Sequence, residues 1–243
     1  MAHNGRALVV FQVRRNMSRV YLDHNATTPL RPEARDAMVS AMDVVGNPSS
    51  VHAEGRDAKM LVERARAQVS AALGAEDADI VFVSSATEAA ALACAGRALH
   101  GAAIEHDAVA AWTDTALAVD GAGHVHVDAP GQSVLQVANY ETGILQTKPY
   151  GIEVSDMTQA FGKLAISFHA SGASMALVSA HKLGGPKGVG ALVLRRGLDV
   201  VARIRGGGQE MGRRSGTENV IGIAGFGAAA EAAQRDVEGG KWA

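Results

Sequence analysis

The amino-acid sequence predicts an α/β fold with a mostly parallel, mixed sheet and helices on both faces. Segments with strand-like and helix-like patterns alternate along most of the 243 residues. Most strand candidates are continuous apolar runs, which is typical of strands covered on both faces. Hydrophobic residues make up 47% of the chain, which is enough to form a large buried core.

The individual elements follow from the spacing of apolar residues. They recur every three or four positions in residues 31–42 and 54–73, which predicts two amphipathic helices. The run DIVFVSS (79–85) predicts a strand, and the alanine-rich run at 87–99 predicts a helix directly after it. Residues 217–240 are predicted to be helical. Six further strands are predicted, at 101–105, 124–129, 133–139, 152–155, 175–179 and 188–195.

Composition argues against several classes of protein. The net charge of −2 does not favour a nucleic-acid surface. No apolar run approaches the about 20 residues that a membrane-spanning helix needs. The single cysteine, Cys94, excludes an intrachain disulfide, and its helical pattern predicts a buried apolar role. Residues 1–17 are predicted to be a disordered extension, because no signal-peptide cleavage site follows their short apolar stretch.

The start of the helix after DIVFVSS is a candidate anion site. Thr87 is predicted at or near the N-cap, and Glu88 follows it in the first turn. The N–H groups of a first helical turn are unpaired and the helix dipole is positive there, so the turn can bind a phosphate. The alternative is an ordinary capped helix.

The run EVSDMTQAFGK (153–163) holds a second candidate site. Asp156 lies at the carboxyl end of a short strand, where open α/β sheets contact their ligands. A carboxylate there can hold a proton on a heteroaromatic nitrogen, and Gln159 can reach the same ligand. Alternatively, Asp156 is the N-cap of a helix over residues 157–161.

The run SAHKLGGPKGVGALVL (179–194) holds a third candidate site. It lacks the Ser/Thr of a Walker A loop and leads into a strand, so a nucleotide-binding loop is rejected. Lys182 is either a surface charge or an amine with a lowered pKa that forms a Schiff base. A Schiff-base lysine together with an acidic partner for a pyridine nitrogen is typical of pyridoxal phosphate (PLP) enzymes.

Eight motifs occur in one order between about residue 20 and residue 225: VYLDHNATTPL, GNPSSVHAEGR, IVFVSSATEA, EHDAV, ANYETGILQ, SDMTQAFGK, SAHKLGGPKGVGALVL and GGGQEMGRRSGTENV. In these motifs the chain resembles the cysteine desulfurases of the class V aminotransferase family, the NifS-like group. The resemblance implies the PLP-binding large domain of an aspartate aminotransferase-like fold over residues 18–225. It also implies a cytoplasmic protein that needs no metal.

The resemblance implies roles around the cofactor ring. Lys182 would hold the cofactor as a Schiff base and later act as the general base. His106 would stack on the pyridine ring, and Asp156 would pair with its protonated nitrogen. Gln159 would donate to the phenolic oxygen, and Asn139 would contact substrate or cofactor.

The resemblance also implies a phosphate site, a substrate mouth and a homodimer. The residues implied for the phosphate are Ala86, Thr87, Ser179, Ala180 and His181. The residues implied for the substrate mouth are Asn25, Ala26, Thr27 and Thr28. Thr217 would reach the phosphate of the neighbouring subunit, which is why a homodimer is implied.

The implied activity is PLP-dependent conversion of L-cysteine to L-alanine, with sulfur passed on for iron–sulfur cluster or other sulfur-cofactor assembly. An acceptor or scaffold protein is therefore an expected partner. The family's persulfide-forming cysteine lies in a smaller C-terminal domain, to which residues 226–243 are expected to lead. Cys94 cannot replace it, because Cys94 lies in the cofactor domain. The alternatives are another PLP lyase or aminotransferase of the family, and an inactive partner that retains the fold.

Overall fold

A computed structural model describes residues 19–147 and 149–241, so the extension predicted at 1–17 lies outside the described residues. Its main sheet has five strands in the order β1-β7-β6-β5-β4. Their bounds are Ala78–Val83 (β1), Val134–Gln136 (β4), Val154–Asp156 (β5), Met175–Ser179 (β6) and Gly190–Arg195 (β7). The α/β fold and the mixed sheet are confirmed.

Strands β4, β5 and β6 are parallel, whereas β7 runs antiparallel to both of its neighbours, β6 and β1. Since β7 is antiparallel to both β6 and β1, β1 points the same way as β4, β5 and β6, and the prediction of a mostly parallel, mixed sheet is confirmed. The exception, β7, follows from the short connection between β6 and β7, because a parallel neighbour would need a crossover of a dozen or more residues.

A second, two-stranded sheet pairs β2 (His100–Ala102) with β3 (Asp114–Leu117) in parallel. An isolated bridge between His100 and Ser133 places it beside β4. The strand predicted at 124–129 is wrong, because this segment forms only an isolated bridge between Val119 and Val125.

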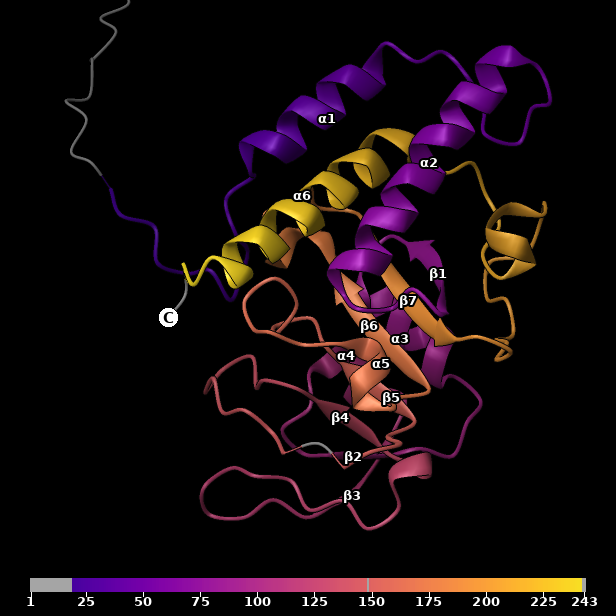
Figure 1. The fold of residues 1–243 in the computed structure, drawn as a ribbon. Helices are drawn as coiled ribbons and strands as arrows, with labels where there is room; N and C mark the ends of the chain where they lie inside the picture. Colours follow the sequence, from indigo (N-terminus) through magenta and orange to yellow (C-terminus); the bar gives the residue numbers. More distant parts are fainter. Residues whose placement is uncertain (1–18, 148, 242–243) are drawn as a thin grey trace, which may run out of the picture.

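Helices cover both faces of the main sheet. On one face α1 (Pro32–Met42), α2 (Ala53–Ala72) and α6 (Val220–Glu238) lie side by side (Figure 1). The other face is covered by α3 (Ala86–Cys94), which packs on β6 and β7. The remaining short helices are α4 (Asp107–Ala110), α5 (Phe168–Ser171) and three 3₁₀ turns, η1 (Pro130–Gln132), η2 (Ala180–Lys182) and η3 (Gln209–Gly212). No helix of the described residues is long and apolar enough to cross a membrane.

Helix α6 packs closely against α2 and belongs to the same core as the sheet. A Cβ atom on Gly227 would lie 2.6 Å from the Cα of Ala65, so only glycine permits this approach. Phe226 is fully buried in the same cluster as Phe82 of β1. The domain boundary predicted at residue 225 therefore falls inside a helix that is part of the core.

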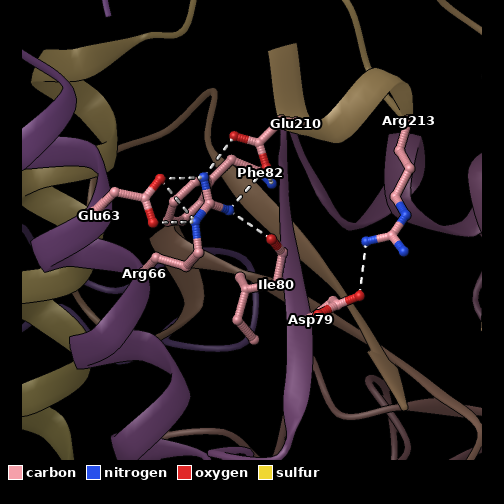
Figure 2. A network of polar contacts seen from close by, with 7 residues as sticks. All are labelled: Glu63, Arg66, Asp79, Ile80, Phe82, Glu210 and Arg213. Atoms are coloured by element: carbon pink, nitrogen blue, oxygen red, sulfur yellow. Dashed lines mark hydrogen bonds and ion pairs between the residues drawn. The ribbon is translucent and has the colours of Figure 1, made fainter. Parts of the chain in front are cut away.

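The segment 205–219, called here the 205–219 loop, is held against β1 by ion pairs (Figure 2). Arg66 of α2 donates to both carboxylate oxygens of Glu210, at 2.8 and 2.9 Å. The same carboxylate accepts from the backbone N–H of Phe82 at 2.9 Å. Arg213 pairs with Asp79 at 2.9 Å. Glu210 has a φ of +48°, a conformation that L-residues rarely adopt, so these contacts hold a strained turn in place.

Candidate active site

A cavity of about 210 Å³ lies where β5 and β6 end and α3 begins. Chain segments that are far apart in sequence meet there, as expected for the carboxyl edge of an α/β sheet. Its wall includes most of the residues predicted for the cofactor: Ala86, Thr87, His106, Asp156, Gln159, Ser179, His181 and Lys182. The structure thus brings the three candidate sites together in one place.

Helix α3 begins where the candidate anion site was predicted, and its N-cap is Ser85, two residues before Thr87. The Ser85 hydroxyl accepts from the N–H of Glu88 at 3.3 Å, and the Glu88 carboxylate accepts from the N–H of Ser84 at 2.7 Å. These reciprocal contacts resemble a capping box, with Ser85 as the capping residue in place of the predicted Thr87. Thr87 lies two residues after Ser85, in the first turn, where it lines the cavity.

The side chain of Ser179 favours a phosphate site at the start of α3. Its side chain is buried, lines the cavity and has an Oγ without a hydrogen-bond partner among the described residues. Burying a hydroxyl without a partner is unfavourable. A phosphate group that accepted from this hydroxyl and from the first turn of α3 would remove that cost.

Asp156 is the last residue of β5, as predicted, and borders the cavity. Its Oδ1 accepts from the N–H of Thr158 at 2.9 Å in a local turn. No helix follows at 157–161, so the alternative reading as a helix N-cap is wrong. Burial raises the pKa of Asp156, although Thr158 and the nearby His106 and Lys182 charges oppose this.

Lys182 lies in the 3₁₀ turn η2, after β6 and before the glycine-rich connection to β7. Its Nζ donates to the backbone carbonyls of Asn25 and Ala26, the latter at 3.2 Å. Burial lowers the pKa of Lys182, and the charges of Asp156 and Asp23 only partly offset this. The reading as a fully solvated surface charge is therefore wrong, and the amine is easier to deprotonate than a free lysine.

His106 is the N-cap of α4 and lines the cavity. Its Nδ1 accepts from the N–H of Ala108 at 3.1 Å, so in the neutral ring the proton lies on Nε2. The His106 ring meets the edge of Tyr140, with centroids 5.0 Å apart. These two contacts fix the imidazole in the cavity wall.

Tyr140 is in the cavity wall, and the neighbouring Asn139 is not. The Asn139 side chain is buried in a turn, where its Oδ1 accepts from the N–H of Thr142 at 2.8 Å and its Nδ2 donates to the carbonyl of Ile104 at 3.0 Å. Asn139 therefore lies outside the cavity wall, with its side chain held in this turn. Sequence reasoning missed Tyr140 because it could not tell which of two adjacent side chains faces inward.

Two further predicted residues lie outside the cavity wall. Ala180 is fully buried, and Thr217 is exposed on the 205–219 loop. The opening segment lies next to the cavity: Thr27 Oγ1 is 3.1 Å from His181 Nδ1, and Thr28 donates to the carbonyl of Lys182 at 2.9 Å. Asn25 lines a smaller neighbouring cavity of about 140 Å³, which Lys182 also lines.

Glu105 is a buried acidic residue that the sequence analysis did not select. Its Oε1 accepts weakly from the N–H of Gln136 at 3.4 Å, and its Oε2 has no partner among the described residues. Burial, and then the charge of Asp156, raise the pKa of Glu105 to about 8. A carboxylate at the end of a predicted strand is the signal that selected Asp156, and the same signal would have found Glu105.

The raised pKa of Glu105 predicts a pH-dependent stability. In the unfolded chain this carboxyl ionises near its ordinary pKa of 4.5, whereas in the folded protein it stays protonated to about pH 8. Between these values the folded state holds more protons, so the free energy of unfolding falls as pH rises. Glu105→Gln should remove this fall and gain stability over the natural chain at pH 8, measured by urea unfolding. Identical pH slopes in the two proteins would contradict the prediction.

Residues 20–122 and 136–238 match the family described as Aminotransferase class-V. A cysteine desulfurase from Frankia sp. (strain EuIK1) is 39% identical over 260 residues, which cover 88% of this chain and 62% of that protein. A cysteine desulfurase from Cereibacter sphaeroides is also 39% identical, with 89% and 66% of the two chains covered. The chain thus spans less than two thirds of the length of these relatives.

Solved structures show the same fold. A NifS-like protein from Rickettsia africae ESF-5 superimposes with a TM-score of 0.81 and 35% identity, over 90% of this chain and 70% of that one. A structure described as SspA in complex with cysteine superimposes with a TM-score of 0.78 and 29% identity, over 87% of this chain and 72% of that one.

Proposed function

This chain belongs to the class-V aminotransferase family, and we propose that it is a cysteine desulfurase that acts on L-cysteine through PLP. The family is PLP-dependent. The observation that carries the proposal is the convergence of Lys182, Asp156, His106 and an anion site on one cavity. Curated relatives named cysteine desulfurase favour this activity over others of the family.

The residues present fit PLP. The unpartnered Ser179 hydroxyl and the first turn of α3 would hold its phosphate. Asp156 would face the ring nitrogen, and His106 would lie against the ring. When bound, PLP supplies an electron-withdrawing ring that stabilises negative charge on the substrate's α-carbon.

Residues of this chain would take up the proton that leaves the substrate's α-carbon. Because burial lowers its pKa, Lys182 can release a proton from Nζ and take one from the substrate's α-carbon. Asp156 would supply a carboxyl group beside the ring nitrogen; burial raises its pKa, and the Thr158 hydrogen bonds and the charges of His106 and Lys182 oppose this. The contact between the His106 imidazole and the Tyr140 ring holds both groups in the cavity wall.

The substrate and product are tested directly. We expect PLP-loaded protein to change its visible absorbance when L-cysteine is added, and L-alanine to appear when an acceptor thiol is supplied. The structure described as SspA in complex with cysteine supports this choice of amino acid. A protein that binds no PLP at all would overturn the proposal, and one that responds equally to other amino acids would favour a different member of the family.

Cys94 is not proposed as the sulfur acceptor. It is fully buried in α3, as predicted, and burial raises the pKa of its thiol to about 12, so the reactive thiolate is scarce at neutral pH. We expect the 243-residue chain to form little or no persulfide from L-cysteine, and Cys94→Ala to leave PLP binding unchanged. Transfer of radiolabelled sulfur from L-cysteine measures this, and label on Cys94 would contradict it.

A homodimer is part of the proposal. Thr217 is exposed on the 205–219 loop, which the contacts of Glu210 and Arg213 hold against α2 and β1. An exposed residue on a loop held in this way is suited to reach the phosphate site of a second copy. A sulfur-acceptor or scaffold protein and a cytoplasmic location are proposed on the family relationship alone.

A further inference from the structure

Lys163 is a charged residue that lies beside the larger cavity without lining it. It follows β5 at the end of the turn 157–163 and is half-buried. Its Nζ donates to Oε1 of Gln159 at 2.8 Å. It lines the smaller cavity of about 140 Å³, together with Asn25 and Lys182. Lys163 is therefore linked to the larger cavity through Gln159, which lines it.

The Gln159 amide is held from two sides. Its Oε1 accepts from the Lys163 ammonium, and its Nε2 donates to the backbone carbonyl of Asn25 at 3.0 Å. Rotating the amide by half a turn would place its NH₂ group against the ammonium and its oxygen against the Asn25 carbonyl. Both contacts would then be repulsive, because an ammonium only donates and a carbonyl only accepts. One amide orientation is selected.

In the selected orientation one N–H of Gln159 has no acceptor among the described residues. An amide NH₂ group has two hydrogens, and the Asn25 carbonyl accepts only one of them. Since Gln159 lines the larger cavity, a ligand there that offers an acceptor can take the second. Burial, and then the charge of Lys182, lower the pKa of Lys163 to about 8, so its charged donor is still present at pH 7.

We propose that Lys163 is a positioning residue, which orients the Gln159 amide so that its free N–H donates to the polar edge of PLP. The inference rests on the proposed function, because it takes PLP as the ligand of the larger cavity. Lys163 itself contacts neither cofactor nor substrate in this proposal. It fixes the orientation of the Gln159 amide before the ligand binds, so that binding costs less side-chain conformational entropy.

The test is a double-mutant cycle on PLP binding, with Lys163→Met, Gln159→Ala and the double variant. We expect Lys163→Met to weaken PLP binding up to about tenfold, as the loss of one hydrogen bond would. It should also shift the pH midpoint of the visible absorbance of bound PLP. In the Gln159→Ala background the same change should have less than about a twofold effect, because the amide it orients is gone. Lys163→Arg keeps a donor and should restore the natural affinity and pH midpoint.

An equal loss in both backgrounds would overturn the proposal, since Lys163 would then act directly or through the fold. No loss in the natural background would also overturn it, and it would leave the proposed function intact. If the natural chain binds no PLP, the proposed function fails as well. Thermal unfolding of each variant checks folding, and Lys163→Ala, which also lacks a donor, replaces Lys163→Met if the latter does not fold.

Discussion

Lys182→Ala abolishes the covalent attachment of PLP, and this is the largest effect that we expect. Lys182 is the single lysine in the wall of the 210 Å³ cavity among the described residues. An alanine has no amine, so no Schiff base with the cofactor can form. Borohydride reduction followed by mass spectrometry of peptides measures the attachment. The expected result is a reduced adduct on Lys182 in the natural chain and none in the variant.

Lys187→Ala is the matched control for this experiment. It lies five residues after Lys182 in the same glycine-rich connection, but it is exposed and does not line the cavity. It should keep the full adduct. An adduct that persists in Lys182→Ala, or one that disappears in Lys187→Ala, would contradict the assignment of the amine.

Glu210→Ala is expected to produce the second largest effect, a loss of stability. The Glu210 carboxylate is 2% exposed, and its removal leaves the Arg66 guanidinium without its main partner and the Phe82 N–H without an acceptor. Removing one member of a buried ion pair costs about 3–5 kcal/mol. Urea unfolding at neutral pH measures the loss.

Glu63→Ala is the matched control, because Glu63 pairs with the same arginine at 3.2 Å but is 52% exposed. A solvent-exposed pair contributes less than about 1 kcal/mol, so the control should unfold close to the natural chain. Equal losses in the two variants would contradict a special role of the buried pair. Since Arg214 of the same loop pairs with Glu88 at 2.9 Å, loosening the loop should also weaken the anion site at α3.

The helices on the face of α1 and α2 could be predicted well from the sequence. The spacing predicted 31–42 and 54–73, and the structure has Pro32–Met42 and Ala53–Ala72. These helices are amphipathic and bury one stripe, so the local pattern carries the information. Apolar and polar residues alternate in the segment 124–129, as in a strand. Among the described residues this segment pairs only through the bridge between Val119 and Val125, and so it forms no strand. The polar, mostly exposed β3 was missed because it has no apolar pattern.

The sequence predicted those candidate-site residues that lie at or just after the end of a strand. Asp156 ends a strand and Lys182 follows one, and both positions are visible in the local pattern. Asn139 and Tyr140 show the limit of this reasoning. Both follow β4 in the same motif, and only the turn that ties the Asn139 side chain to Thr142 decides that Tyr140 lines the cavity.

The sequence by itself determined the α/β fold and most of its helices and strands, and it selected Asp156 and Lys182 as candidates at the ends of strands, because these features depend on periodicity and on neighbours along the chain. Only the tertiary structure decided the ionisation of Glu105, the pairing of Arg66 with Glu210 and the orientation of the Gln159 amide. The ionisation depends on burial, the ion pair joins residues 144 positions apart, and the amide needs a carbonyl 134 positions away. Such contacts depend on distances through space, which no local pattern contains.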